Sequence, residues 1–327
     1  MKALVFEAPE KPVVAEVGIP DLSPNEVLVH TKAVGICHSD YELLAGRYII
    51  PISYPVTPGH EWSGEIVEVG RNVQGFNKGD RVVGECVVRT PERLHHFGFS
   101  ISGADREYFT VNPEWLHKLP DAVDDKKAAL IEPFTCGFYA VLRSGGTNAS
   151  ETVVISGGGT IGLVSAAAAI GMGARVIVVD PLASRRDVAK RLGADVALDP
   201  SDGGAAETIR ELTGGKGADL VIEASGHDAS LAAAFDYARE EGRVSMVGIN
   251  IGRKVPVVIG QIQMKNLTVR GCIGSPGVWP AAIRFLERTG IDLSPIQTHD
   301  FALTEAVQAF AFGQDPTKSI KITLLNG

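Results

Sequence analysis

Short apolar runs of strand-like composition fill the chain from its start to about residue 130. Pro and Gly separate these runs, and residues 27–36 alternate loosely between apolar and polar positions, as a half-buried strand does. Glycines that recur between Gly64 and Gly84 indicate the turns or bulges of a tightly coiled barrel. We therefore predict an all-β first region with strands at Lys2–Glu7, Glu26–Val34, Trp62–Val69, Asp80–Val88 and Tyr108–Val111.

The pattern changes at Lys126, after which helical spacing alternates with short, wholly apolar runs. Such runs are typical of strands that are buried on both faces of a parallel sheet, so we predict a doubly wound α/β fold here. The expected helices are Lys126–Leu142, Ser184–Leu192, Ala229–Glu240, Val278–Arg288 and Leu303–Phe312. The expected strands are Val153–Ile155, Val176–Val179, Leu220–Glu223, Arg243–Val247, Leu267–Gly271 and Ile320–Leu325.

A glycine-rich turn follows the first buried strand and fits the G-x-G-x-x-G pattern. In that pattern the first glycine makes the tight turn, the second lets the backbone approach a pyrophosphate, and the third lets the helix lie close to the strand. The next strand ends in an acid roughly 20 residues past the turn, where a carboxylate can bind a ribose diol. The residues expected to bind a dinucleotide are Gly157, Gly159, Thr160, Ile161, Gly162 and Asp180.

The same stretch has an alternative interpretation as a membrane-spanning helix. No charged residue occurs between Thr152 and Ala174, and Gly158 with Gly162 also fits G-x-x-x-G. Six glycines in that span argue against a single helix, and Asp180 at the expected distance favours dinucleotide binding.

Composition and charge exclude several classes of partner. The 327 residues suffice for two domains, and the net charge of −8 argues against nucleic acid or an anionic membrane surface as a main partner. The four cysteines are far apart and form no C-x-x-C pair, so a disulfide framework is not expected. Glu7 and Pro9 interrupt the N-terminus before an apolar signal region forms, which points to a reducing, cytoplasmic context.

Three short motifs in the β-rich region carry candidate metal ligands. They are Cys37-His38-Ser39-Asp40, Gly59-His60-Glu61, and Glu132. A thiolate, an imidazole and carboxylates from separate loops can form an open zinc site with room for water or substrate. Each motif alone is unremarkable, but the three in this order before a dinucleotide fold form a specific combination.

With these motifs, the chain resembles the medium-chain, zinc-dependent alcohol and polyol dehydrogenases over its whole length. GHEWSGEIVEVG followed by FNKGDRV is similar to the zinc signature of that family. The resemblance implies a GroES-like β-barrel catalytic domain, formed by residues 1–133 and 274–327, and a Rossmann domain at residues 134–273. It implies catalytic zinc at Cys37 and His60, with Glu61 or Glu132 as the carboxylate ligand.

The resemblance also implies a mechanism in which zinc lowers the pKa of a substrate hydroxyl and the alkoxide passes hydride to NAD. Ser39 would begin a proton relay, and Glu42 stands where the family often has the relay's His. His38 would bind pyrophosphate or face solvent, and Asp40 would orient His60 or act as a turn acceptor. Lys321 would contact the pyrophosphate or be a solvated strand-end lysine. Asp180 favours NAD over NADP, although Arg185 and Arg186 soften that preference.

The structural-zinc lobe of many relatives is missing, because Val88–Ser102 contains no cysteine. We therefore predict one zinc ion per chain, and we interpret the adjacent His95 and His96 as loop or substrate-cleft residues. The loop could shape the cleft or an oligomer contact.

The leading hypothesis is an NAD-dependent zinc dehydrogenase for a polar secondary alcohol, such as a polyol, sugar or cyclitol. The alternatives are a zinc-free NADPH quinone or enone reductase of the same superfamily and a non-catalytic dinucleotide-binding protein. A homodimer or homotetramer is expected, because edge strands such as Leu267–Gly271 commonly pair across a twofold axis in the family that this chain resembles.

Overall fold

The computed structural model describes residues 1–47, 52–89, 94–249, 252 and 254–326. Two compact units make up the chain: Met1–Glu132 with Gln297–Gly327, and Pro133–Ile296. The first boundary lies next to the expected one, whereas residues 274–296 lie in the second unit instead of the first. The reason is that Phe285 packs its ring on Phe134 and Phe138, with centroids 6.1 and 5.1 Å apart.

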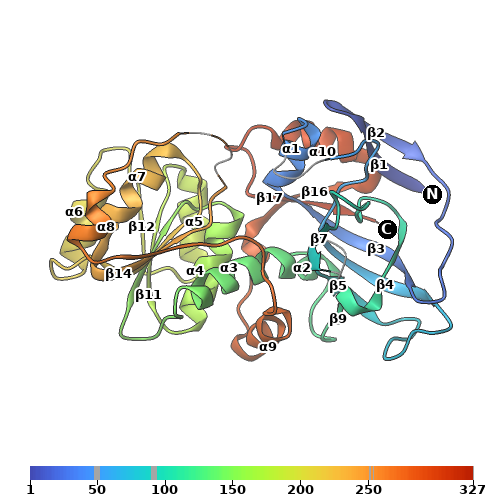
Figure 1. The fold of residues 1–327 in the computed structure, drawn as a ribbon, viewed down its shortest axis with the longest axis horizontal. Helices are drawn as coiled ribbons and strands as arrows, with labels where there is room; N and C mark the ends of the chain where they lie inside the picture. Colours follow the sequence, from blue (N-terminus) through green and yellow to red (C-terminus); the bar gives the residue numbers. More distant parts are fainter. Residues whose placement is uncertain (48–51, 90–93, 250–251, 253, 327) are drawn as a thin grey trace. The chain divides into compact units, whose positions relative to one another are not determined.

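The first unit is built on a seven-stranded mixed sheet in the order β16-β17-β3-β4-β5-β9, with β8 also paired to β3 (Figure 1). Its strands are β1 (Lys2–Ala8), β2 (Lys11–Glu16), β3 (Val27–Ile36), β4 (Glu61–Val69), β5 (Arg81–Gly84), β6 (Val87–Arg89), β7 (Leu94–His96), β8 (Tyr108–Val111), β9 (Leu116–Lys118), β16 (Gln297–Ala302) and β17 (Lys321–Leu325). Its helices are α1 (His38–Leu44), α2 (Asp125–Ala128) and α10 (Ala306–Gly313), with short 3-10 turns at Pro113–Trp115 and Leu303–Glu305.

Strand β3 is the centre of this sheet because its side chains are buried along almost its whole length. It pairs with β4, β8 and β17, so it joins the two ends of the chain in one sheet. At Gly64 of β4, a Cβ atom would lie 2.7 Å from the carbonyl oxygen of His30, so this close approach requires glycine. One apolar cluster surrounds Phe6 and Phe310, and a second surrounds Trp62 and Phe109.

The second unit contains a six-stranded parallel sheet in the order β12-β11-β10-β13-β14-β15 (Figure 1). Its strands are β10 (Thr152–Ser156), β11 (Arg175–Val179), β12 (Val196–Leu198), β13 (Ala218–Glu223), β14 (Ala238–Met246) and β15 (Thr268–Gly271). Its helices are α4 (Thr160–Gly171), α5 (Ala183–Arg191), α6 (Ala205–Leu212), α7 (Asp228–Tyr237), α8 (Gly260–Met264) and α9 (Trp279–Thr289), with a 3-10 turn at Ser294–Ile296; α3 (Ile131–Arg143) begins at the boundary.

Counted from β10, this order is 3-2-1-4-5-6, the doubly wound order of the Rossmann fold, and it confirms the predicted α/β class. The strand order reverses between β10 and β13. Helix α4 packs on β10 and β11, while α6 and α7 share an apolar cluster with the strands. In the part of the chain that the structure describes, no helix has the length and apolar character needed to cross a membrane. The membrane-helix alternative therefore fails, because its residues form β10 and α4.

Several elements differ from the sequence predictions for local reasons. The helix expected at Lys126–Leu142 is divided into α2, which begins after the N-cap residue Asp124 and ends at Ala128, and α3, which begins at Ile131. The helix expected to reach Glu240 ends at Tyr237, because Ala238 joins the sheet opposite Ala218. The elements that were not predicted are β2, β7, β9, β12, β16, α1, α6 and α8.

Candidate functional site

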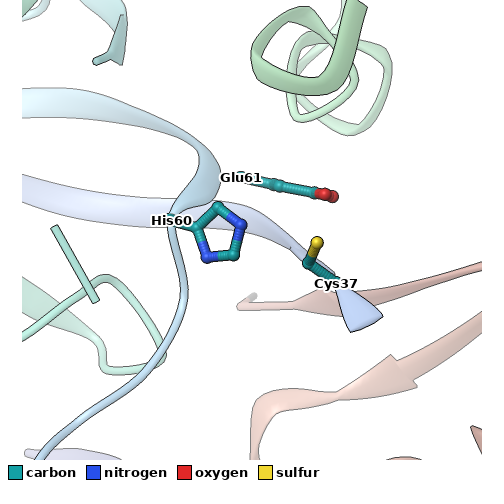
Figure 2. Close-up of side chains that lie close together, drawn as sticks. All are labelled: Cys37, His60 and Glu61. Carbon is teal, nitrogen blue, oxygen red and sulfur yellow. The ribbon is translucent and has the colours of Figure 1, made fainter. Parts of the chain in front are cut away.

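Cys37, His60 and Glu61 converge at one end of the β3–β4 pair (Figure 2). Cys37 follows β3 and precedes α1, while His60 and Glu61 lie at the start of β4. Antiparallel pairing sets Gly35 opposite Glu61, which brings the two loops together. One potential ligand atom from each of the three residues lies within 4.8 Å of the other two. A thiol sulfur, an imidazole nitrogen and a carboxylate oxygen form a donor set that suits zinc.

Glycine at position 35 is required by this arrangement. A Cβ atom on Gly35 would lie 2.4 Å from Oε2 of Glu61 and 3.3 Å from the Lys321 side chain. The residue two positions before Cys37 therefore leaves the space that the Glu61 carboxylate occupies.

Asp40 connects Cys37 with His60. Its Oδ2 accepts a hydrogen bond from the Cys37 amide at 2.9 Å, and its Oδ1 lies 3.3 Å from Nδ1 of His60. The second contact is an ion pair, but its geometry is not that of a hydrogen bond. Burial alone lowers the pKa of His60, but the Asp40 carboxylate, Cys86 and Cys37 outweigh burial and raise it well above its usual value. Asp40 is therefore in a position to orient the His60 ring.

Lys321 is buried against Glu61. Its Nζ lies 2.5 Å from Oε2 of Glu61 and donates to the carbonyl of Ile36 at 2.9 Å. The two side chains are 2% and 1% exposed, so the ion pair is shielded from water. Burial lowers the pKa of Lys321, but the charge and hydrogen bond of Glu61, together with Cys37 and Asp40, outweigh burial and raise it. The predicted pyrophosphate contact is not among these bonds and stays a prediction.

Glu132 lies in the first turn of α3 and is buried, but it does not belong to the group of three close ligand atoms. Burial raises the pKa of its carboxyl to about 7, with a further rise from Glu61 and an opposing effect of the His60 charge. The structure therefore brings Glu61, and not Glu132, together with Cys37 and His60.

The remaining sequence candidates of this unit lie around the centre. Ser39 is buried in the first turn of α1, whereas the His38 side chain is 84% exposed, with its Nε2 3.9 Å from Oε1 of Glu42. His96 is buried at the end of β7, and its Nε2 has no hydrogen-bond partner among the described residues. The ring of Phe99, in the turn that follows, lies 5.0 Å from the ring of His60. Residues 90–93 of the Val88–Ser102 loop lie outside the described residues.

The glycine turn of the second unit has the expected shape. Gly157 has a φ of +106°, which favours glycine, and a Cβ on Gly162 would lie 1.8 Å from the Gly157 carbonyl oxygen. Gly159 is the N-cap of α4 without a side-chain cap, and a Cβ there would meet nothing within 4 Å. Open space in front of an uncapped helix N-terminus suits a phosphate group. Thr160 and Ile161 form the first turn of α4 behind it.

Asp180 is tied to this turn by both carboxylate oxygens. Oδ2 accepts from the Gly158 amide at 2.7 Å, and Oδ1 accepts from the Leu182 amide at 2.8 Å. Arg185 adds an ion pair of 3.5 Å to Oδ2. The structure therefore places Asp180 in direct contact with Gly158 of the motif, and the expected ribose contact stays a prediction.

Sequence reasoning missed the partner of Lys321 and the role of Glu223, which ends β13 in full burial. A lysine that opens an apolar strand and a carboxylate that ends a buried one were the available signals, because both positions normally favour apolar residues.

Known protein families match both units. The model of the alcohol dehydrogenase GroES-like domain matches residues 23–121, and that of the zinc-binding dehydrogenases matches residues 160–288. The sorbitol dehydrogenase of Halalkalibacterium halodurans is 32% identical over 337 residues, which cover 95% of each chain. A zinc-binding dehydrogenase of Sinorhizobium meliloti 1021, solved bound to NADP, has a TM-score of 0.92 and 30% identity, with 99% of each chain covered.

The crystal structure of 2R,3R-butanediol dehydrogenase from Bacillus subtilis also superposes, with a TM-score of 0.92 and 29% identity over 100% of this chain and 99% of that chain. These similarities support a nucleotide cofactor and oxidoreductase activity. The chain therefore belongs to the medium-chain, zinc-type alcohol and polyol dehydrogenase family.

Proposed function

We propose that the protein oxidises a polar secondary alcohol to the ketone, with one zinc ion per chain and NAD as the hydride acceptor. The convergence of Cys37, His60 and Glu61 within 4.8 Å is the observation that carries this proposal. The donor set fits zinc, and the open N-terminus of α4 fits the phosphates of a dinucleotide. A zinc ion at this centre would act as a Lewis acid toward the substrate oxygen.

The protein's own residues set up that chemistry. Cys37 and His60 would hold the ion, and Asp40 fixes both by its contacts to the Cys37 amide and to Nδ1 of His60. Lys321 holds Oε2 of Glu61, so it would compete with a bound metal ion for that carboxylate. Glu132 is the second candidate carboxylate, since the charges of His60 and Glu61 act on its buried carboxyl. Ser39 would be the first hydroxyl of a proton relay, which accepts the proton of the substrate hydroxyl as it passes its own proton on toward solvent.

The preference for NAD rests on Asp180, because a carboxylate at this position repels a 2′-phosphate. Asp180 is buried and held by two backbone amides, so its charge is fixed beside the glycine turn. Arg185 partly offsets that charge through its ion pair with Asp180.

The proposed substrate class is a polyol, sugar or cyclitol. The sorbitol and butanediol dehydrogenases to which the chain is similar are named for substrates with more than one hydroxyl group. Nε2 of buried His96 has no hydrogen-bond partner among the described residues, so it could bind a hydroxyl group of such a substrate. His96 lies three residues before Phe99, whose ring packs on His60.

The test is a screen of polyols, sugars and cyclitols for NADH formation by the wild type and by Cys37→Ser. We expect turnover of at least one polar secondary alcohol and its loss in the variant. Enone reduction with NADPH that survives Cys37→Ser would favour the zinc-free reductase. Nucleotide binding without any turnover would favour the non-catalytic alternative.

A homodimer through the edge of the second unit's sheet forms part of the proposal. Strand β15 is last in the sheet order, and all four of its residues are exposed. Val269 on this strand and the nearby Met264 and Ile273 are exposed apolar side chains, which a second copy could cover.

A further inference from the structure

Glu223 is a fully buried carboxylate that the proposed chemistry does not use. It is the last residue of β13 and has no exposed surface. Its Oε1 accepts hydrogen bonds from the Ser225 amide at 3.0 Å, the Ser225 hydroxyl at 2.8 Å, the Gly226 amide at 3.1 Å and the Ser230 hydroxyl at 2.7 Å. Hydrogen bonds to a carboxylate are stronger than those to a neutral acceptor, so these four donors hold the loop firmly on Glu223.

The backbone of Glu223 connects the loop after β13 to the loop after β14. Its carbonyl oxygen accepts from the amides of Val247 at 2.8 Å and Gly248 at 2.9 Å. The two loops are in contact, because a Cβ atom on Gly248 would lie 2.1 Å from the Gly226 amide nitrogen and 2.6 Å from Oε2 of Glu223. One residue therefore fixes both loops through its side chain and its main chain.

The same network reaches the glycine turn. The Ser230 hydroxyl, which donates to Glu223, lies 2.7 Å from the hydroxyl of Ser156, the last residue of β10. A Cβ atom on Gly157 would lie 2.8 Å from Cβ of Ser225, so the loop after β13 rests on the first glycine of the motif. Glu223 thus stands where the strand order reverses, between the ends of β10 and β13.

In a doubly wound sheet, a dinucleotide binds across the point at which the strand order reverses, with one half on each side. The glycine turn and Asp180 belong to the β10–β11 side, where the adenosine half binds. The loops after β13 and β14 belong to the other side. We propose that Glu223 is a positioning residue, which holds the first residues after each strand, 224–227 and 247–249, in the shape that receives the nicotinamide half. This inference rests on the proposed dinucleotide cofactor.

The test separates the two halves of the cofactor by calorimetric titration of the full-length protein. NADH or NADPH, whichever the wild type binds more tightly, reports on both halves, and ADP reports on the adenosine half alone. Glu223→Gln keeps the shape of the side chain but removes its charge, and it places a donor beside the Gly226 amide. We expect dinucleotide binding to weaken about tenfold, the effect of one charged hydrogen bond, while ADP binding stays unchanged.

Asp219→Asn is the matched control, because Asp219 lies near the other end of the same strand. Its carboxylate accepts from the Thr152 amide at 2.8 Å and from Nε of Arg239 at 2.7 Å. This variant should bind both ligands as the wild type does. If Glu223→Gln does not fold, Ser230→Ala serves in its place, since it removes one donor to Glu223 and the link to Ser156.

Equal weakening of dinucleotide and ADP binding would overturn the inference, because a merely structural role predicts it. Unchanged dinucleotide binding in both Glu223→Gln and Ser230→Ala would overturn it as well. Failure of the wild type to bind either dinucleotide would overturn the proposed cofactor and this inference together. A selective loss of dinucleotide binding in the variants would support the inference.

Discussion

At the scale of single residues, the centre of the first unit gathers buried ionisable side chains. Asp40, His60, Glu61, Glu132 and Lys321 are each at most 7% exposed. Charges removed from water destabilise a fold unless partners or a metal ion compensate them. Asp40 faces His60, and Lys321 faces Glu61, so each charge of these pairs depends on the other. Substitution of one member therefore leaves the other uncompensated.

Lys321→Met tests this dependence. The variant leaves the Glu61 carboxylate buried without its ammonium partner, so we expect the metal-free protein to lose about 3–5 kcal/mol of unfolding free energy. Urea denaturation after chelation measures this loss. The double variant Lys321→Met/Glu61→Gln removes the uncompensated charge and should recover most of the stability.

Lys126→Met is the matched control for Lys321→Met. Lys126 pairs with Asp300 at 2.6 Å, but both side chains are more than a third exposed. An exposed pair contributes only about 0–1 kcal/mol. A loss in Lys321→Met no larger than in Lys126→Met would contradict the buried-pair account.

The raised pKa of Glu132 predicts that the stability of the metal-free protein depends on pH. The unfolded chain ionises this carboxyl near the ordinary pKa of 4.5, whereas the folded protein keeps the proton until about pH 7. The folded state binds more protons in that window, so the unfolding free energy falls as the pH rises from 4.5 to 7. Glu132→Gln removes the effect and should gain up to about 3 kcal/mol relative to wild type between pH 5 and 8. A difference between the two proteins that stays constant across this range would rule the interpretation out.

At the scale of elements, the β10–α4 junction needs glycine for two different reasons: Gly162 for close packing within the protein, and Gly159 for the approach of a phosphate group. A Cβ on Gly162 would clash with the Gly157 carbonyl oxygen at 1.8 Å, whereas a Cβ on Gly159 would meet no protein atom within 4 Å. We expect Gly162→Ala to lower the melting temperature of the protein by several degrees. Gly159→Ala should fold with near wild-type stability but bind NADH at least tenfold more weakly, since the methyl group occupies the phosphate approach. Differential scanning fluorimetry and calorimetric titration measure the two effects, and wild-type NADH affinity in Gly159→Ala would refute the phosphate assignment.

The elements also show how far the sequence could predict this structure. The glycine turn, β10, β11 and Asp180 were predictable because the motif states which residue makes each close contact. Cys37, His60 and Glu61 were predictable as a set, since their side-chain chemistry suits zinc. The break between α2 and α3 had no signal in the helical spacing, and Glu61, the partner of Lys321, lies 260 positions away along the chain. Contacts between such distant segments leave no periodic signal along the chain.

At the scale of the whole molecule, one chain supplies a candidate metal centre in one unit and a candidate dinucleotide site in the other. We expect the chain to associate through β15, because the open edge carries exposed Val269 with Met264 and Ile273 close to it in sequence. Light scattering after size exclusion should give the mass of a dimer or of a tetramer for the wild type. Val269→Asp should lower that mass, whereas Ile19→Asp, at an exposed position of the first unit, should not. A monomeric wild type would contradict the expectation.

Metal analysis of the purified protein tests the central claim most directly, because the zinc-free and non-catalytic alternatives both predict no catalytic metal. We expect about one zinc ion per chain in the wild type, and a large loss of zinc in Cys37→Ser and in His60→Ala. Cys86→Ser is the control, since buried Cys86 lies outside the group of three ligand residues and should leave the zinc content unchanged. A wild type without zinc, or Cys37→Ser and His60→Ala that keep a full equivalent, would contradict the account.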